Sequence, residues 1–388
     1  MNRNFVDIAM AAGLLGSILL IFFVEPHRPP TQQTQITDVE QASEIVAKES
    51  PLKIAVTPDY PGYDDVGHML DTLGSGFAYT KLPFDHLLEV DKLREFDVVF
   101  ITCSGYPPSW LGSPIGGTRR GQDLYTQNPE IFARAHTALR QFVEAGGTLY
   151  TSDLHFPLIS DSFPDWSASP TAVRGSAQSL LAEVVDDGLR ESIGAHVRLT
   201  FDQEGWFPAE LDGPGITTYL RGEFLTDKGK KHSAALLVKI PYGQGSVIFT
   251  SFHNEKQTSK QEMQLLKYLV FSTVTAGMDS EVDRQLAQGG FSRTKQNLFA
   301  ATPGSQSATR EYHNASVNDL QFVLAFSSGA ELELEIQSPD NKKTTKKDTE
   351  TIVIEIPNAP IGTWTYTVRA INVPNDNFPF TINIGAKP

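Results

Sequence analysis

Residues 142–153, FVEAGGTLYTSD, decide the fold because they join the end of a helix to a β-strand through two glycines. The helical segment begins at residues 128–130 (Asn-Pro-Glu), where an N-cap residue precedes a proline in the first turn. Gly146 and Gly147 end it, and Thr148 to Asp153 predicts a buried strand. A helix that leads directly into a strand is typical of an α/β sheet with crossover helices.

The same alternation extends to both sides of this segment. Leu52 to Pro58 and Phe96 to Cys103 predict two further buried strands, with a helix at about 65–73 between them. Ser233 to Pro241 and Ser246 to Phe252 predict a hairpin, which is followed by a helix at about 259–275. We therefore expect residues 51–277 to form an α/β domain with a parallel sheet.

The C-terminal part of the chain has a different period. In ELELEIQ (331–337) the Leu and Ile side chains fall on one face of a strand and the Glu side chains on the other. Several alternating segments of this kind, separated by turns rich in Asn, Asp, Pro and Gly, predict an all-β sandwich over residues 316–388. We expect the polar stretch 278–315 to be a linker with one short helix.

Almost all continuous apolar sequence lies near the N-terminus. After a short tail (1–4), residues 5–24 form a 20-residue apolar segment, long enough to cross a bilayer as a helix. We predict an uncleaved signal anchor followed by a polar linker (25–50), although a cleaved signal peptide or a buried helix is also compatible with the segment. The expected location is a single-pass membrane protein with most of its chain outside the cytoplasm, in the periplasm or at the cell surface.

Composition excludes several classes of protein. The 388 residues carry 32 Lys and Arg against 46 Asp and Glu, so the net charge of −14 argues against nucleic-acid binding, which requires clustered cations. The single Cys excludes an intrachain disulfide. No cofactor motif is found, and the expected partners are the membrane, through the N-terminal helix, and an envelope protein or a glycan.

Three segments together resemble a known family. FDVVFITCSG (96–105), FVEAGGTLYTSD and GQGSVIFTSFHNE (243–255) resemble, in this order, the class I glutamine amidotransferase-like superfamily, which has a flavodoxin-like fold. The resemblance covers about residues 51–277. It implies a nucleophilic Cys on a tight turn after a strand and a His-x-Glu pair after a later strand. The C-terminal sandwich resembles the pre-peptidase C-terminal modules of secreted proteins.

The resemblance breaks at the nucleophile. His253 and Glu255 match the His-x-Glu pair, but Asp153 stands where the nucleophilic Cys is expected, with Ser152 before it. A carboxylate cannot form the thioester of glutamine hydrolysis, so we expect that this activity is absent. Cys103 is expected to be a buried, inert thiol. The alternative is a hydrolase that uses His253 and Glu255 with Ser152 or Asp153.

Ligand-binding candidates follow from the rule that ligands of open α/β sheets bind at the carboxyl ends of the strands. Two Arg in a glycine-rich stretch of the loop 105–127 are candidates for an anion clamp. We predict no metal site, because Asp, His and Glu from separate loops have no fixed ligand spacing. The ligand-binding candidates are Asp59, Tyr60, Ser104, Tyr106, Arg119, Arg120 and His155.

The leading hypothesis for function is a membrane-anchored binding or assembly protein of the cell envelope with a non-catalytic amidotransferase-like domain. The hydrolase described above is the first alternative. The second is a carbohydrate-binding envelope protein in which Trp110, Trp166 and Trp206 stack against sugars.

Overall fold

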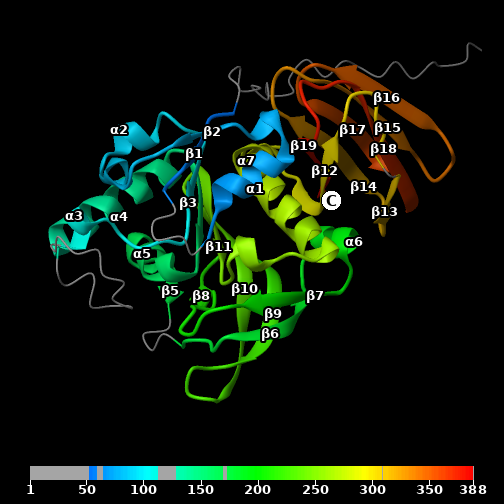
Figure 1. Ribbon diagram of the computed structural model, residues 1–388. Helices are drawn as coiled ribbons and strands as arrows, with labels where there is room; N and C mark the ends of the chain where they lie inside the picture. Colours follow the sequence, from blue (N-terminus) through cyan, green and yellow to red (C-terminus); the bar gives the residue numbers. More distant parts are fainter. Residues whose placement is uncertain (1–51, 59–63, 112–127, 169–172, 308, 388) are drawn as a thin grey trace, which may run out of the picture. The chain divides into compact units, whose positions relative to one another are not determined.

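The computed structural model describes residues 52–58, 64–111, 128–168, 173–307 and 309–387 (Figure 1). The predicted tail (1–4), anchor (5–24) and linker (25–50) lie outside these ranges. Within the described ranges, no helix is both long and apolar enough to cross a membrane.

A mixed sheet forms the centre of the α/β part, in the order β2-β1-β3-β4-β11-β10-β9-β6-β7. The first five strands of this order are parallel to one another, and the rest pair antiparallel. The strands are β1 Ile54–Val56, β2 Tyr79–Lys81, β3 Val98–Ile101, β4 Thr148–Ser152, β6 Gln178–Val184, β7 His196–Phe201, β9 Thr217–Leu225, β10 Lys231–Tyr242 and β11 Gly245–Thr250.

The predicted strands at 52–58, 96–103 and 148–153 and the predicted hairpin are present as β1, β3, β4 and β10–β11. The expectation of a parallel sheet holds only for one half of it. Short turns join β9 to β10 and β10 to β11, and such turns can connect only antiparallel neighbours, because a parallel pair needs a long crossover. The added antiparallel strands therefore extend the sheet beyond the crossover part.

Helices cover both faces of the sheet (Figure 1). Alternation along β3 places Val98 and Phe100 in a core cluster with α1 (Val66–Leu73) and α7 (Lys260–Gln288), and Val99 and Ile101 in a second cluster with α4 (Pro129–Glu144). The other helical elements are η1 Ser75–Phe77, η2 Phe84–Leu88, α2 Val90–Leu93, α3 Pro108–Leu111, η4 Asp153–His155, α5 Phe156–Ser162, α6 Asp187–Ile193 and η5 Asn254–Lys256; β5 Ser167–Ala168 pairs with β8 Leu211–Asp212.

The start of α4 and the end of α7 differ from the prediction. Asn128 precedes α4, but its side chain makes no capping hydrogen bond and instead donates to the carbonyl of Ser109 at 3.3 Å. At α7, Ser259 and Glu262 form a reciprocal capping box. This helix does not end near 275 but continues to Gln288, and its last turns place Val282 and Leu286 against Val323 and Ala325 of one C-terminal sheet.

Two four-stranded antiparallel sheets form the C-terminal β-sandwich, in the orders β12-β19-β14-β17 and β13-β18-β15-β16. The predicted alternation in 331–337 is confirmed, since Leu332, Leu334 and Ile336 are buried in the core between the sheets. The strands are β12 Ser292–Ala301, β13 Arg310–Asn314, β14 Asn318–Phe326, β15 Glu331–Gln337, β16 Lys343–Asp348, β17 Ile352–Ala359, β18 Gly362–Asn372 and β19 Phe378–Lys387.

The stretch 278–315 is not the expected linker with a short helix. It holds the end of α7 and the strands β12 and β13. The sequence did not indicate β12 because this edge strand begins with the polar residues SRTKQN. The side chains of residues 292–296 are exposed or half-buried, and Asn297 is the first buried one. The strand is specified by its pairing with β19, a contact distant in sequence.

Candidate functional site

Four side chains from the carboxyl ends of four strands meet at one edge of the sheet. Cys103 follows β3, Asp153 follows β4, Asp202 follows β7 and His253 follows β11. Cys103, Asp153 and His253 are 0%, 3% and 4% exposed, whereas the Asp202 side chain is 26% exposed. This is the edge at which ligands of open α/β sheets bind.

Asp153 occupies a tight turn between β4 and the helical segment that follows it. Its φ of 40° is in the left-handed region, which a non-glycine residue adopts at some cost in strain. Its Oδ1 atom accepts a hydrogen bond of 3.0 Å from the backbone N–H of Phe207. A strained strand-to-helix turn is how nucleophile elbows present a side chain above a sheet.

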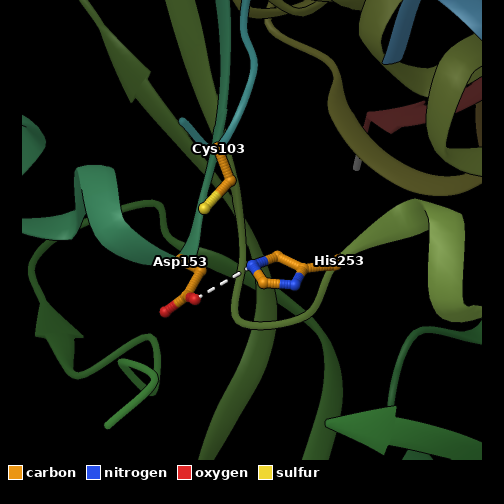
Figure 2. Close-up of side chains that lie close together, drawn as sticks. All are labelled: Cys103, Asp153 and His253. Carbon is orange, nitrogen blue, oxygen red and sulfur yellow. Dashed lines mark ion pairs between the residues drawn. The ribbon is translucent and has the colours of Figure 1, made fainter. Parts of the chain in front are cut away.

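His253 lies between two carboxylates. Its Nε2 is 3.1 Å from Oδ2 of Asp153 (Figure 2). Its Nδ1 is 3.0 Å from Oδ1 of Asp202. The first contact is an ion pair by distance, but Nε2 makes no hydrogen bond of normal geometry to any described residue. Burial lowers the pKa of His253, but contacts with the Asp153 carboxylate and the Cys103 sulfur outweigh it and hold this pKa well above its usual range.

Cys103 belongs to the same cluster, which the sequence did not indicate. Its sulfur points toward Asp153 and His253, and the ligand atoms of the three residues all lie within 4.8 Å of one another (Figure 2). Burial raises the pKa of the Cys103 thiol to about 11, so the thiol is neutral near pH 7. The carboxylate of Asp153 therefore supplies the negative charge beside Nε2 that favours a raised pKa of His253.

Glu255 does not orient His253, contrary to our expectation. Its side chain is 49% exposed and lies 3.8 Å from Lys256, while Asp202 takes the position next to Nδ1. The chain turns outward at Asn254, whose Nδ2 donates to Asp64 at 3.1 Å, so that the next side chain faces solvent. Asp202 directly follows the alternating strand HVRLTF, and this position at a strand end was the available signal.

Ser152 is fully buried, and no hydrogen bond joins it to His253 within the described part of the chain. Ser152 is the last residue of β4, and Asp153 begins the tight turn that follows it. Of the two proposed partners of His253, only Asp153 lies beside it.

Three of the ligand-binding candidates lie within the described residues, and each has a structural hydrogen bond. The His155 ring is buried, donates from Nε2 to the carbonyl of Thr102 at 3.0 Å and accepts at Nδ1 from the Tyr106 hydroxyl at 3.1 Å. Ser104 is buried, and its hydroxyl donates to the carbonyl of Gly105. His155, Tyr106 and Ser104 thus have structural hydrogen bonds. Asp59, Tyr60, Arg119 and Arg120 lie outside the described residues.

The three tryptophans proposed as sugar platforms are core residues. Trp110, Trp166 and Trp206 are 0%, 4% and 2% exposed. Trp110 stacks on Tyr106, Trp166 on Phe163 and Trp206 on Phe201. A ring enclosed in this way offers no free face to a sugar, so the prediction of a tryptophan-lined glycan site is wrong.

Two cavities bear on function. A small cavity of about 10 Å³ lies beside the cluster, and the residues that line it include Asp153, Asp202, Trp206 and His253. This volume has room for about one water molecule. A much larger cavity of about 700 Å³ lies where β9 begins and β10 ends, at the opposite edge of the sheet. Its walls include Thr217, Tyr219, Lys239, Tyr268, Asp283 and Arg293.

No family model matches the chain, and no curated protein sequence matches it either. Similar solved structures include a cytoplasmic protein of Salmonella typhimurium LT2, with 13% identity, a TM-score of 0.37 and coverage of 58% of this chain and 98% of the other. They also include a glutamine amidotransferase from Thermotoga maritima, with 13% identity, a TM-score of 0.36 and coverage of 62% and 94%.

An exo-β-1,4-mannosidase of an Opitutaceae bacterium is matched at 12% identity and a TM-score of 0.29, with coverage of 61% of this chain and 36% of the other. The structural neighbours of this chain thus include an amidotransferase-like fold. At these identities and TM-scores they carry no conclusion about its activity or partners.

Proposed function

We propose that this chain is a membrane-anchored, extracytoplasmic binding or assembly protein whose amidotransferase-like domain is not catalytic. The observation that carries the proposal is the state of Asp153. This side chain occupies the strained turn where an amidotransferase would present its nucleophile, and it is held there by Phe207 and His253. The Phe207 N–H holds Oδ1 of Asp153, so one of the two carboxylate oxygens is already engaged in the fold.

The space at the cluster supports the same proposal. About 10 Å³ adjoins His253 and Asp153, whereas pockets that hold small substrates are of the order of 300–1,000 Å³. Trp206 and Phe252, which line this space together with His253, are buried core residues. The anchor over residues 5–24 and the extracytoplasmic location are part of the proposal and rest on the sequence.

Turnover assays test the catalytic part directly. The full chain is compared with His253→Ala on glutamine and on panels of ester, amide and glycoside substrates, with Glu255→Gln as a control that changes an exposed carboxylate of the same turn. We expect equal background rates in all three proteins. Turnover that disappears in His253→Ala and persists in Glu255→Gln would reject the non-catalytic proposal.

A hydrolase with a carboxylate nucleophile remains the second candidate, and one observation favours it. Asp153, His253 and Asp202 have the order of a nucleophile, a base and an orienting carboxylate, with contacts of 3.1 and 3.0 Å. Attack of the Asp153 carboxylate on the anomeric carbon of a glycoside would expel the leaving alcohol and form a glycosyl ester, whereas attack on an ester or amide would expel the alcohol or amine and form an acid anhydride. Water activated by His253 would then hydrolyse either intermediate and restore the carboxylate. The same assays with Asp153→Asn added decide, because this hydrolase loses its turnover in both Asp153→Asn and His253→Ala.

A binding function needs a place for a ligand, and the 700 Å³ cavity supplies one. Its cations are already paired: Arg293 lies 3.1 Å from Asp283, and Lys295 lies 3.0 Å from Glu191. Walls of hydroxyls, backbone and neutralised charges favour an uncharged ligand with many hydroxyl groups, such as the glycan expected from the sequence. Tyr219 and Tyr268 add aromatic surface, with ring centroids 6.1 Å apart.

A substitution that fills the cavity tests whether a glycan binds there. Thr217→Trp places a large ring at the cavity wall, and Leu225→Trp places the same ring at the other end of β9, where Leu225 is 46% exposed. A set of soluble envelope glycans is titrated against each protein by calorimetry. We expect binding that Thr217→Trp removes and Leu225→Trp preserves; equal binding by both variants would place the ligand elsewhere.

The membrane part is tested by fractionation of cells that express the full chain or a chain without residues 1–30. We expect the full chain in the membrane fraction and the truncated chain in the soluble fraction. Full-length protein in the soluble fraction would reject the anchor.

A further inference from the structure

The cluster of Cys103, Asp153 and His253 has the composition of a metal site, although the sequence predicted none. A sulfur, a carboxylate oxygen and an imidazole nitrogen from three different strand ends lie within 4.8 Å of one another, and all three residues are buried. Figure 2 shows the sulfur directed toward the other two groups. We propose that Cys103, Asp153 and His253 bind one Zn²⁺ ion.

Distances in the cluster fit tetrahedral zinc. Two nitrogen or oxygen ligands at about 2.0–2.2 Å from zinc are separated by roughly 3.3–3.6 Å in a tetrahedral arrangement. The Nε2 atom of His253 and Oδ2 of Asp153 are 3.1 Å apart, so a shift of a few tenths of an ångström would bring them to this separation.

The unsatisfied atom of the cluster points to the same conclusion. Nε2 of His253 is buried and finds no hydrogen-bond acceptor of normal geometry among the described residues. A buried polar atom without such a partner is rare and calls for an explanation. As a ligand, Nε2 would direct its lone pair at the metal, and the Cys103 thiol and the imidazole would each give up the proton held there.

The groups behind these ligands have the roles that zinc sites require. Asp202 accepts from Nδ1 of His253 at 3.0 Å, the carboxylate–histidine–metal arrangement that fixes the tautomer and the orientation of a ligating ring. The Phe207 N–H holds the other oxygen of Asp153 at 3.0 Å. Both ligands are thus oriented by contacts already in the fold.

The donor set selects the metal and its coordination. A thiolate with an imidazole favours zinc over magnesium or calcium, which prefer oxygen ligands. Three protein ligands leave a fourth position, and the adjacent 10 Å³ has room for about one water molecule. Such an ion would fasten the ends of β3, β4 and β11 together. The inference rests on this geometry and not on the absence of catalysis, so it stands or falls separately from the proposed function.

The test uses the full chain without a histidine tag, stripped with chelator and titrated with Zn²⁺, with bound metal measured by mass spectrometry. We expect one zinc per chain, loss of binding in Cys103→Ser and His253→Ala, and ~10–100-fold weaker binding in Asp202→Asn. Glu255→Gln, which changes an exposed acid two residues from a ligand, should bind like the parent chain. Circular dichroism shows which variants are folded.

Titration with Co²⁺ tests directly whether the Cys103 sulfur binds the metal, because a cysteine with a purely structural role gives no absorption from a sulfur–cobalt bond. We expect a sulfur-to-cobalt charge-transfer band that Cys103→Ser abolishes and Glu255→Gln keeps. A stoichiometry far below one, or equal binding by the parent chain and Cys103→Ser, would overturn the proposal. Glutamine or ester turnover by the zinc-loaded chain would reject the proposed function but leave the site in place.

Discussion

Asp202 Oδ1 lies 3.0 Å from Nδ1 of His253, and this contact joins a residue after β7 to a residue after β11. The strands between them in the sheet run antiparallel to their neighbours, so the contact bridges the parallel and antiparallel halves. Asp202 therefore has two roles: it orients the imidazole, and it ties the loop 202–210 to the end of β11.

Asp202→Asn should weaken that connection. The variant replaces a charge-assisted hydrogen bond by a neutral one at a side chain that is 26% exposed, so we expect the free energy of unfolding to fall by about 1–2 kcal/mol. Urea denaturation followed by circular dichroism measures it. Glu255→Gln is the control and should change stability by less than ~0.5 kcal/mol. Equal stability of the two variants would mean that Asp202 does not hold His253.

Asp64 is a buried anchor for the turn that carries His253. Its carboxylate accepts hydrogen bonds from Asn254 Nδ2 and from the backbone N–H groups of Glu255 and Asp65, at 3.0–3.1 Å. Asp64→Asn removes one strong acceptor and brings an NH₂ group to face donors, so we expect a loss of about 2–3 kcal/mol. Asp71→Asn, at an exposed position of α1, is the matched control. Chemical denaturation that gives the same midpoint for both variants would contradict this role.

The backbone of Gly175 lies against the ring of Trp206. A Cβ at this glycine would lie 1.9 Å from a ring carbon of Trp206, while Gly175 N–H donates to the Trp206 carbonyl. Gly175→Ala must displace the ring from its stack with Phe201, and we expect a loss of about 1–3 kcal/mol with altered tryptophan fluorescence.

Gly277 is a control for Gly175, because a Cβ at this glycine has free space around it. It lies within α7, and a Cβ there meets nothing closer than 3.9 Å. Gly277→Ala should therefore stabilise the protein by about 0.5–1 kcal/mol through helix propensity. Thermal unfolding of the two alanine variants should show shifts of opposite sign, and shifts of the same sign would contradict the packing described here.

His136 on α4 should make stability depend on pH. Burial, with the nearby Arg140 charge, lowers the pKa of His136 to about 4, against about 6.5 in an unfolded chain. Between these values the unfolded state binds more protons, so the free energy of unfolding falls as the pH drops from ~6.5 toward ~4. Because the ring is partly exposed, we expect His136→Gln to remove only about 1–2 kcal/mol of this fall. Parallel pH profiles of the two proteins would exclude His136 as its source.

Local sequence patterns predicted much of the fold. The strands β1, β3, β4, β10 and β11 were predicted because their residues are nearly all apolar or β-branched, and β15 because its residues alternate. Strand β12 was missed, since its polar residues form a strand only through pairing with β19. The direction of the added strands β6, β7 and β9 depends on turn length and long-range pairing, which residue periodicity does not encode.

The candidate site was predicted in part. Asp153 and His253 were identified from the resemblance to the amidotransferase-like superfamily, and the structure places Oδ2 of Asp153 3.1 Å from Nε2 of His253. Glu255 was expected beside His253 because the two match the His-x-Glu pair of the superfamily, but Asn254 turns inward to Asp64 and leaves Glu255 in solvent. Cys103 was considered alone, and only the arrangement of the strands in the sheet shows which side chains face its sulfur.

The strand ends enclose the Cys103 sulfur, and the reaction of Cys103 with a thiol reagent tests this burial most directly. Cys103 is the only cysteine of the chain, so the signal has one source. With Ellman's reagent, the native full chain should react at least ~100-fold more slowly than the urea-unfolded chain, because its sulfur is 0% exposed and becomes reachable only through opening of the structure. Rapid and complete reaction of the native chain would show an open site and contradict the account.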